Sequence, residues 1–267
     1  MDLIEIRGLR IAFERAGAGP PVLLLHGLLA DSRAWLPQLA DLSADFTVVA
    51  WDAPGCGQSS DPPESFRMAD FAECVALLID ELGLESPAVV GLSFGGALAL
   101  QVFDRRPTVP SSLALVSAYA GWAGSLPDDL VRDRRQSCLQ ESRQPPERFV
   151  RKWMPSLFTS RAPEELVDDV VHLMSTSFHP IGYRAMVHSL AESDLRHVLP
   201  TIDVPTLLIH GSEDQRCPAT VSDELHRQIK HSELVTLQGV GHFSNLEAPK
   251  RFNTELRRFL ESQTTSW

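Results

Sequence analysis

The stretch of the chain that decides the fold reads Gly91-Leu-Ser93-Phe-Gly95-Gly96. It follows an apolar run, residues 88–92, that predicts a buried strand, and it leads into residues 95–105, which predict a helix. A strand-to-helix turn this tight strains the serine and exposes its Oγ, next to a helix N-terminus that favours negative charge. We therefore predict that Ser93 is a nucleophile, the alternative being a glycine-rich packing turn with a surface serine.

Strand-like and helix-like segments alternate on both sides of this turn. The expected strands cover residues 3–7, 10–15, 21–26, 46–51, 88–92, 112–117, 205–210 and 233–237. The expected helices of the same layer cover residues 33–42, 68–82, 95–105, 218–229 and 248–260. Apolar runs joined by amphipathic helices are typical of βαβ units, so we predict an α/β fold with a doubly wound, mostly parallel sheet.

The segment between residues 119 and 197 has a different pattern. It lacks a convincing strand, is punctuated by prolines, and predicts short helices over residues 128–140, 146–154, 163–175 and 181–192. We interpret 119–197 as a helical cap, or lid, inserted into a core formed by 1–118 and 198–267. The alternative is a run of ordinary crossover helices.

Composition and charge exclude several classes of protein. The 267 residues include 24 Lys and Arg against 35 Asp and Glu, a formal net charge of −11, and 43% are hydrophobic. Such a chain is globular, and its acidity argues against nucleic acid or an anionic membrane as a partner. We expect a small-molecule substrate and a monomer or homodimer.

Targeting and metal-binding signals are weak along the sequence. The first ten residues lack the features of a signal peptide, and no apolar run is long enough to span a membrane. The cysteines, Cys56, Cys74, Cys138 and Cys217, form neither a CxxC pair nor a zinc-ligand spacing. We therefore expect a reduced cytoplasmic protein without a metal or other cofactor.

A nucleophilic serine needs a base, and the base needs an acid to orient it. His242, in Gly239-Val-Gly-His242-Phe, follows the last predicted strand, and Asp214 follows the strand before it. Because carboxyl ends of parallel strands share one edge of a sheet, both side chains should reach Ser93. Glu213 is the alternative acid. The order Ser93, Asp214, His242 differs from that of the two main classes of serine protease.

An oxyanion hole should complete the site. We expect its donors to be the backbone N–H of Phe94, the residue after the nucleophile, and the N–H of Leu28, in the loop that follows strand 21–26. His26 precedes this loop. We interpret it as a brace for the loop rather than as a second base.

Together these motifs resemble the α/β-hydrolase fold family along nearly the whole chain. The matching pieces are His26-Gly27, Asp52-Ala-Pro-Gly-Cys-Gly-Gln-Ser59, Gly91-Leu-Ser-Phe-Gly-Gly96, Gly211-Ser-Glu-Asp214 and Gly241-His242. Residues 202–260 resemble the serine esterase and 3-oxoadipate enol-lactonase branch. The resemblance implies hydrolysis of carboxylic esters or lactones through an acyl-enzyme. The family's haloalkane dehalogenases and epoxide hydrolases use an aspartate nucleophile, so Ser93 argues against both activities.

Several activities share such a triad and stay open at this stage. A lactonase for enol-lactones or acyl-homoserine lactones, a C–C bond hydrolase and a perhydrolase are alternatives within the enzymes. A small-molecule signal receptor on the same fold is the alternative from another class. For the substrate pocket we single out Trp122, Trp153, Phe158 and Met186 of the cap, although a small helical core would use the same residues.

Overall fold

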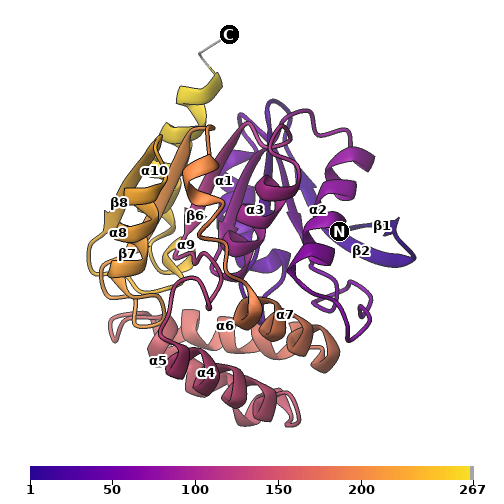
Figure 1. The fold of residues 1–267 in the computed structure, drawn as a ribbon, viewed down its shortest axis with the longest axis vertical. Helices are drawn as coiled ribbons and strands as arrows, with labels where there is room; N and C mark the ends of the chain where they lie inside the picture. The colour runs from indigo at the N-terminus through magenta and orange to yellow at the C-terminus, as the bar shows by residue number, and fades with distance from the viewer. Residues whose placement is uncertain (265–267) are drawn as a thin grey trace.

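A sheet of eight strands forms the centre of the protein in the computed structural model, which describes residues 1–264 (Figure 1). The strands are β1 (Asp2–Ile6), β2 (Leu9–Ala16), β3 (Pro21–Leu25), β4 (Thr47–Trp51), β5 (Ala88–Leu92), β6 (Ser112–Val116), β7 (Thr206–Gly211) and β8 (Ser232–Leu237). Their order across the sheet is β1-β2-β4-β3-β5-β6-β7-β8. The contacts of β2 with β1 and β4 are antiparallel and the others are parallel, which confirms the predicted fold class.

The central strands are buried on both faces. Every residue of β4, β5, β6 and β7 is buried, so consecutive side chains, which point to opposite faces, are all covered. The edge strand β1 buries Ile6 alone. This difference explains why the central strands read as continuous apolar runs in the sequence.

The helices that cover the sheet come from the two segments of the chain that also form its strands, before residue 119 and after residue 197. They are α1 (Leu36–Leu42), α2 (Met68–Glu81), α3 (Phe94–Arg105), α8 (Ala219–Gln228), α9 (Ser244–Glu247) and α10 (Pro249–Thr264), with 3₁₀ turns η1 (Ser32–Trp35) and η3 (Leu199–Thr201). α2 packs on α3, and α1 packs on α10. The single helix predicted over 33–42 is thus divided, because Asp31 caps η1 and Pro37 starts α1 afresh.

Four helices form a separate layer between β6 and β7. They are α4 (Asp128–Glu141), α5 (Val150–Leu157), α6 (Glu164–Ser177) and α7 (Pro180–Glu192), preceded at α5 by the 3₁₀ turn η2 (Pro146–Arg148). Figure 1 shows them below the sheet, where α4 packs on α7 and α5 on α6. All four lie within the segment 119–197, which we call the cap. The last three residues of the predicted core segment 198–267 lie outside the described residues.

The length and polarity of these helices bear on one sequence expectation. Within residues 1–264, no helix is both long and apolar enough to cross a membrane.

Candidate active site

Ser93 occupies the turn between β5 and α3, in a strained backbone conformation. Its φ of 54° and ψ of −107° lie in a region that L-residues rarely adopt. A Cβ on Gly91 would approach the Gly95 carbonyl oxygen to 2.1 Å, and a Cβ on Gly95 would approach that of Leu25 to 2.1 Å. Glycine at these two positions therefore permits the sharp turn that presents the serine.

His242 and Asp214 form a buried pair. Nδ1 of His242 lies 2.8 Å from Oδ2 of Asp214, and the two side chains are 2% and 0% exposed. The other carboxylate oxygen accepts hydrogen bonds of 2.8 Å from the backbone N–H groups of Arg216 and Cys217. Burial by itself raises the pKa of Asp214, but His242 and these N–H groups outweigh it and lower that pKa. The ionised carboxylate thus holds the Nδ1–H tautomer of His242 and leaves Nε2 as an acceptor.

The loop that carries His242 is fastened to the cap. The N–H of Phe243 donates to the carbonyl of Leu157, the last residue of α5, at 3.1 Å. The N–H of Gly241 donates to Oε2 of Glu247 at 2.8 Å. His242 is therefore held in place through both its preceding and its following residue.

The two expected oxyanion donors flank Ser93. Phe94 is the first residue of α3 and is fully buried, while Leu28 belongs to the loop after β3. A Cβ on Gly27 would lie 3.6 Å from the Cβ of Ser93, which shows how closely this loop passes the serine. Leu29 has a φ of 61°, so the loop, like the serine turn, contains a strained residue.

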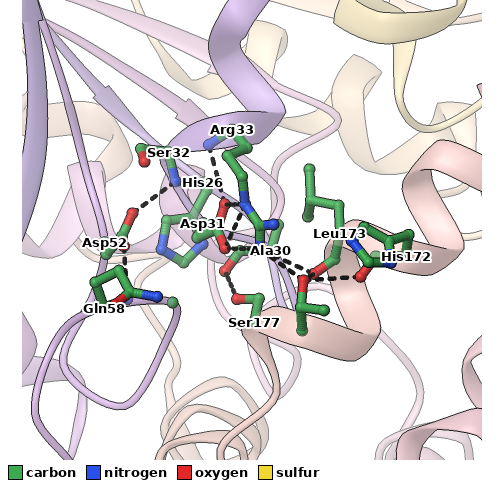
Figure 2. Close-up of polar contacts among 12 residues, drawn as sticks. His26, Ala30, Asp31, Ser32, Arg33, Asp52, Gln58, His172, Leu173 and Ser177 are labelled. Carbon is green, nitrogen blue, oxygen red and sulfur yellow. Dashed lines mark hydrogen bonds and ion pairs between the residues drawn. The ribbon is translucent and has the colours of Figure 1, made fainter. Parts of the chain in front are cut away.

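His26 braces the same loop in a defined tautomer. The backbone N–H of Ala53 donates to Nε2 at 3.0 Å, so the ring proton is on Nδ1, which donates to the Gly27 carbonyl at 2.8 Å. Burial lowers the pKa of His26 and favours this neutral form. Nearby, Asp52 accepts from the N–H of Ser32 at 2.9 Å (Figure 2). His26 is engaged by the backbone on both nitrogens, which is the arrangement of a brace.

The loop that follows β3 and contains Leu28 also contacts the cap, as Figure 2 shows. Arg33 pairs with Asp31 at 2.6 Å and donates to the carbonyl of Leu173 in α6 at 3.3 Å. The hydroxyl of Ser177, at the end of α6, donates to the Ala30 carbonyl at 2.8 Å. The cap thus touches the core on both sides of the serine.

One small cavity is lined by both the serine and the histidine. Its lining residues are Gly27, Leu28, Ser93, Tyr119, Trp122, Trp153, Leu157, Arg216, His242 and Phe243. The volume open to the centre of a water-sized sphere is about 10 Å³, which is room for about one water molecule. The space beside Ser93 is therefore narrow in this structure.

Comparisons with known proteins identify the family of the chain. A sequence profile of the alpha/beta hydrolase family matches residues 22–255. The chain belongs to this family. Among relatives of this alpha/beta hydrolase, the (E)-2-((N-methylformamido)methylene)succinate hydrolase of Acinetobacter baylyi is 24% identical over 92% of each sequence. The 3-oxoadipate enol-lactonase 2 of the same species is 26% identical and covers 88% of this chain and 86% of its own.

A solved structure extends the likeness to three dimensions. A thermophilic esterase from Thermogutta terrifontis matches with a TM-score of 0.90 and 26% identity. The match covers 98% of this alpha/beta hydrolase and 99% of the esterase. The likeness therefore includes the cap as well as the sheet.

The four expected pocket residues of this alpha/beta hydrolase divide into two pairs. Trp122 and Trp153 line the cavity. The structure differs from the expectation for Phe158 and Met186, which are absent from its lining among the described residues. Phe158 turns to an edge-on contact with Phe243, at 5.7 Å between ring centroids. Met186 is fully buried inside the cap interface, with its Sδ 3.8 Å from the Sγ of Cys56.

Sequence reasoning missed Arg216, Tyr119, Leu157 and Phe243 in the lining. Phe243 directly follows His242, and Leu157 directly precedes Phe158, which was expected in the pocket. Arg216 is the exception in chemistry, because it brings a charge to the cavity. The available signal was its place two residues after Asp214, on the same loop at the carboxyl edge of the sheet.

One cluster near the site contains metal-ligand types. One ligand atom each of His210, Asp214 and Cys217 lies within 4.8 Å of the others. Nδ1 of His210 is 3.0 Å from the Ser222 hydroxyl, and both Asp214 oxygens already have partners. Burial raises the pKa of Cys217 well above its usual value and keeps it a thiol, whereas a metal needs the thiolate. The donor set fits its protein partners better than a cation.

Proposed function

We propose that this alpha/beta hydrolase cleaves carboxylic esters or lactones through an acyl-enzyme formed on Ser93. The observation that carries the proposal is one cavity lined by Ser93 and by His242, whose Nδ1 is 2.8 Å from the Asp214 carboxylate. The names of two relatives, an enol-lactonase and an esterase, support the same bond type.

In the first half-reaction, Ser93 Oγ attacks the carbonyl carbon while His242 Nε2 takes the hydroxyl proton. The N–H groups of Leu28 and Phe94 hold the oxyanion of the tetrahedral intermediate. The intermediate collapses as His242 returns the proton to the leaving alkoxide, and the acyl group stays on the serine. With a lactone, the alcohol released remains part of the acyl group.

In the second half-reaction, water takes the place of the alcohol. His242 accepts a proton from the water as it attacks the acyl-enzyme, and returns that proton to Ser93 Oγ as the acid leaves. Throughout, Asp214 stabilises the imidazolium and fixes its orientation. The lowered pKa of Asp214 keeps its charge available at neutral pH.

The test is hydrolysis of p-nitrophenyl esters from acetate to decanoate, with wild type and Ser93→Ala side by side. We expect turnover by the wild type and a loss of roughly 10⁴-fold or more in kcat for the variant, with its melting temperature retained. Lactones follow as substrates, with ring opening recorded by pH-stat. Folded wild-type protein that hydrolyses none of these compounds contradicts the proposal and favours a receptor.

A further inference from the structure

Arg216 gives the cavity a charge that the proposed reaction does not use. The other lining residues present apolar or aromatic side chains, backbone, and the serine and histidine of the proposed reaction. Among the described residues of the lining, Arg216 carries the one permanent charge. Arg216 is half-buried, and a cationic side chain that lines a mostly apolar cavity is an unusual feature, because charged groups next to apolar walls are normally paired.

The Arg216 guanidinium lacks such a pair within residues 1–264. No carboxylate of this part of the chain forms an ion pair with it, and its Cζ lies 3.8 Å from the ring centroid of Trp153. Arg161, on the cap surface close by, does have such a pair, with Glu213 at 2.6 Å. The carboxylate nearest to hand along the chain, Asp214, already holds His242.

The backbone of Arg216 is fixed by the same groups that fix the site. Its N–H donates to Oδ1 of Asp214 at 2.8 Å. Its carbonyl accepts from the hydroxyl of Tyr119 at 2.6 Å and from Nη2 of Arg134 at 2.9 Å. These hydrogen bonds fix the position of the Arg216 backbone relative to Asp214. Stacking on Trp153 orients the plane of the guanidinium.

Glu141 is the acidic group that contacts the edge of the Trp153 ring, and both of its oxygens have partners. Its Oε1 accepts from the indole N–H of Trp153 at 3.1 Å, and its Oε2 accepts from the hydroxyl of Tyr183 at 3.0 Å. Glu141 thus fixes the edge of the ring that stacks on Arg216, and neither of its oxygens forms an ion pair with the guanidinium.

We propose that Arg216 binds a carboxylate carried by the substrate, so that the site prefers anionic esters or lactones to neutral ones. The inference rests on the proposed function and adds the substrate class. A guanidinium donates two parallel hydrogen bonds to a carboxylate, and the apolar walls strengthen both. The substrate carboxylate would then be the ion-pair partner that the guanidinium lacks within residues 1–264. It would also fix the position of the substrate beside Ser93.

The test compares substrates of equal size and different charge. The probes are monomethyl esters of the straight-chain dicarboxylic acids from malonate to adipate, each beside the methyl ester whose free acid is replaced by a primary amide. The value of kcat/KM is measured at pH 7.5 by pH-stat. We expect the wild type to prefer the acid at one chain length or more.

Variants assign this preference to one side chain. In Arg216→Gln the acid-to-amide ratio of kcat/KM should fall by roughly 10- to 100-fold, mainly through KM. Arg216→Lys should keep part of the ratio, since it keeps the charge without the planar fork. Arg161→Gln, which removes an arginine of the cap surface, should leave the ratio unchanged. If Arg216→Gln does not fold, Arg216→Met takes its place.

An unchanged ratio in Arg216→Gln, or a wild type that favours the amides, overturns the inference while the proposed function stands. If the wild type hydrolyses no ester at all, the proposed function fails. The carboxylate site is then tested by binding alone. The same ester pairs are then titrated by calorimetry into Ser93→Ala. Tighter binding of the acid that is lost on adding Arg216→Gln supports the carboxylate site, and equal binding of acid and amide overturns it.

Discussion

The two walls of the cavity are built in different ways. The core wall, with Ser93, His242 and the loop of Leu28, is held by backbone: strained φ values, glycine contacts and N–H donors. The cap wall is held by side chains, as where Trp153 lies 6.3 Å from the ring of Tyr183 and 3.8 Å from the guanidinium of Arg216. From this difference we expect the core wall to carry out the chemistry, and the cap wall, together with Arg216 of the Asp214 loop, to select the substrate.

The largest expected effect is at the core wall. Asp214→Asn should lower kcat on the best p-nitrophenyl ester by roughly 10³- to 10⁴-fold, because an amide cannot hold the Nδ1–H tautomer or balance the imidazolium. Steady-state kinetics measures the loss, and circular dichroism checks the fold. Glu213→Gln is the matched control at the neighbouring residue, whose carboxylate faces Arg161. A greater loss from the control than from Asp214→Asn would reverse the assignment of the acid.

The next effect is on stability. Gly95→Ala puts a methyl group 2.1 Å from the Leu25 carbonyl oxygen, so the free energy of unfolding should fall by about 3 kcal/mol or more. Gly83→Ala is the control, since Gly83 has a φ of +61° but no neighbour within 4 Å of a new Cβ. It should cost about 1 kcal/mol. Urea unfolding gives both values, and equal losses would mean that the turn is less constrained than the contacts indicate.

The contrast between the walls also explains what the sequence could predict. Ser93, Asp214 and His242 each lie in a short string next to a recognisable strand, so local pattern sufficed to bring them together. The cap offered no such strings. Phe158 was expected in the lining, but α5 ends at Leu157 and Phe158 is extended (φ −124°, ψ 156°), which turns its side chain elsewhere.

Arg216 is a lining residue that the local sequence pattern did not predict. Its position depends on Trp153 and Tyr119, which are distant in sequence, and its lack of a carboxylate partner is a property of the folded chain. Sequence pattern reports burial and periodicity well, because neighbours along the chain produce them. It does not report which side chains from separate helices meet over a cavity.

A third prediction concerns His26, whose ring braces the loop that contains Leu28. Burial lowers the pKa of His26 in the folded protein. Below pH 6.5 His26 is therefore protonated to a greater extent in the unfolded chain than in the native protein. Stability should therefore fall as the pH falls, by up to about 1.4 kcal/mol per pH unit for this group. The slope of unfolding free energy between pH 6.5 and 5 should be smaller in His26→Gln.

His210, whose pKa burial also lowers, contributes a second share of the slope that His26→Gln retains. His210→Gln should likewise reduce the slope, by the share of His210 alone. If His26→Gln and wild type have the same slope, His26 is not the neutral brace that its hydrogen bonds indicate.

The smallest expected effect is at the cap wall. Trp122→Leu enlarges the cavity without touching the proposed triad, so kcat should fall by less than about 10-fold while the preferred acyl chain becomes longer. Values of kcat/KM across the p-nitrophenyl ester series measure the change. A kcat as low as that of Asp214→Asn would show that the two walls are not separable.

The central claim is that Ser93 Oγ is the nucleophile that carries the acyl group of a covalent acyl-enzyme. One measurement tests this claim directly. The protein is incubated with a p-nitrophenyl dialkyl phosphate, which phosphorylates an activated serine, and then analysed by intact mass and peptide mapping. We predict one adduct per chain, on the peptide that contains Ser93, with ester hydrolysis lost in proportion. An adduct elsewhere, or full hydrolysis by a chain modified at Ser93, would contradict the account.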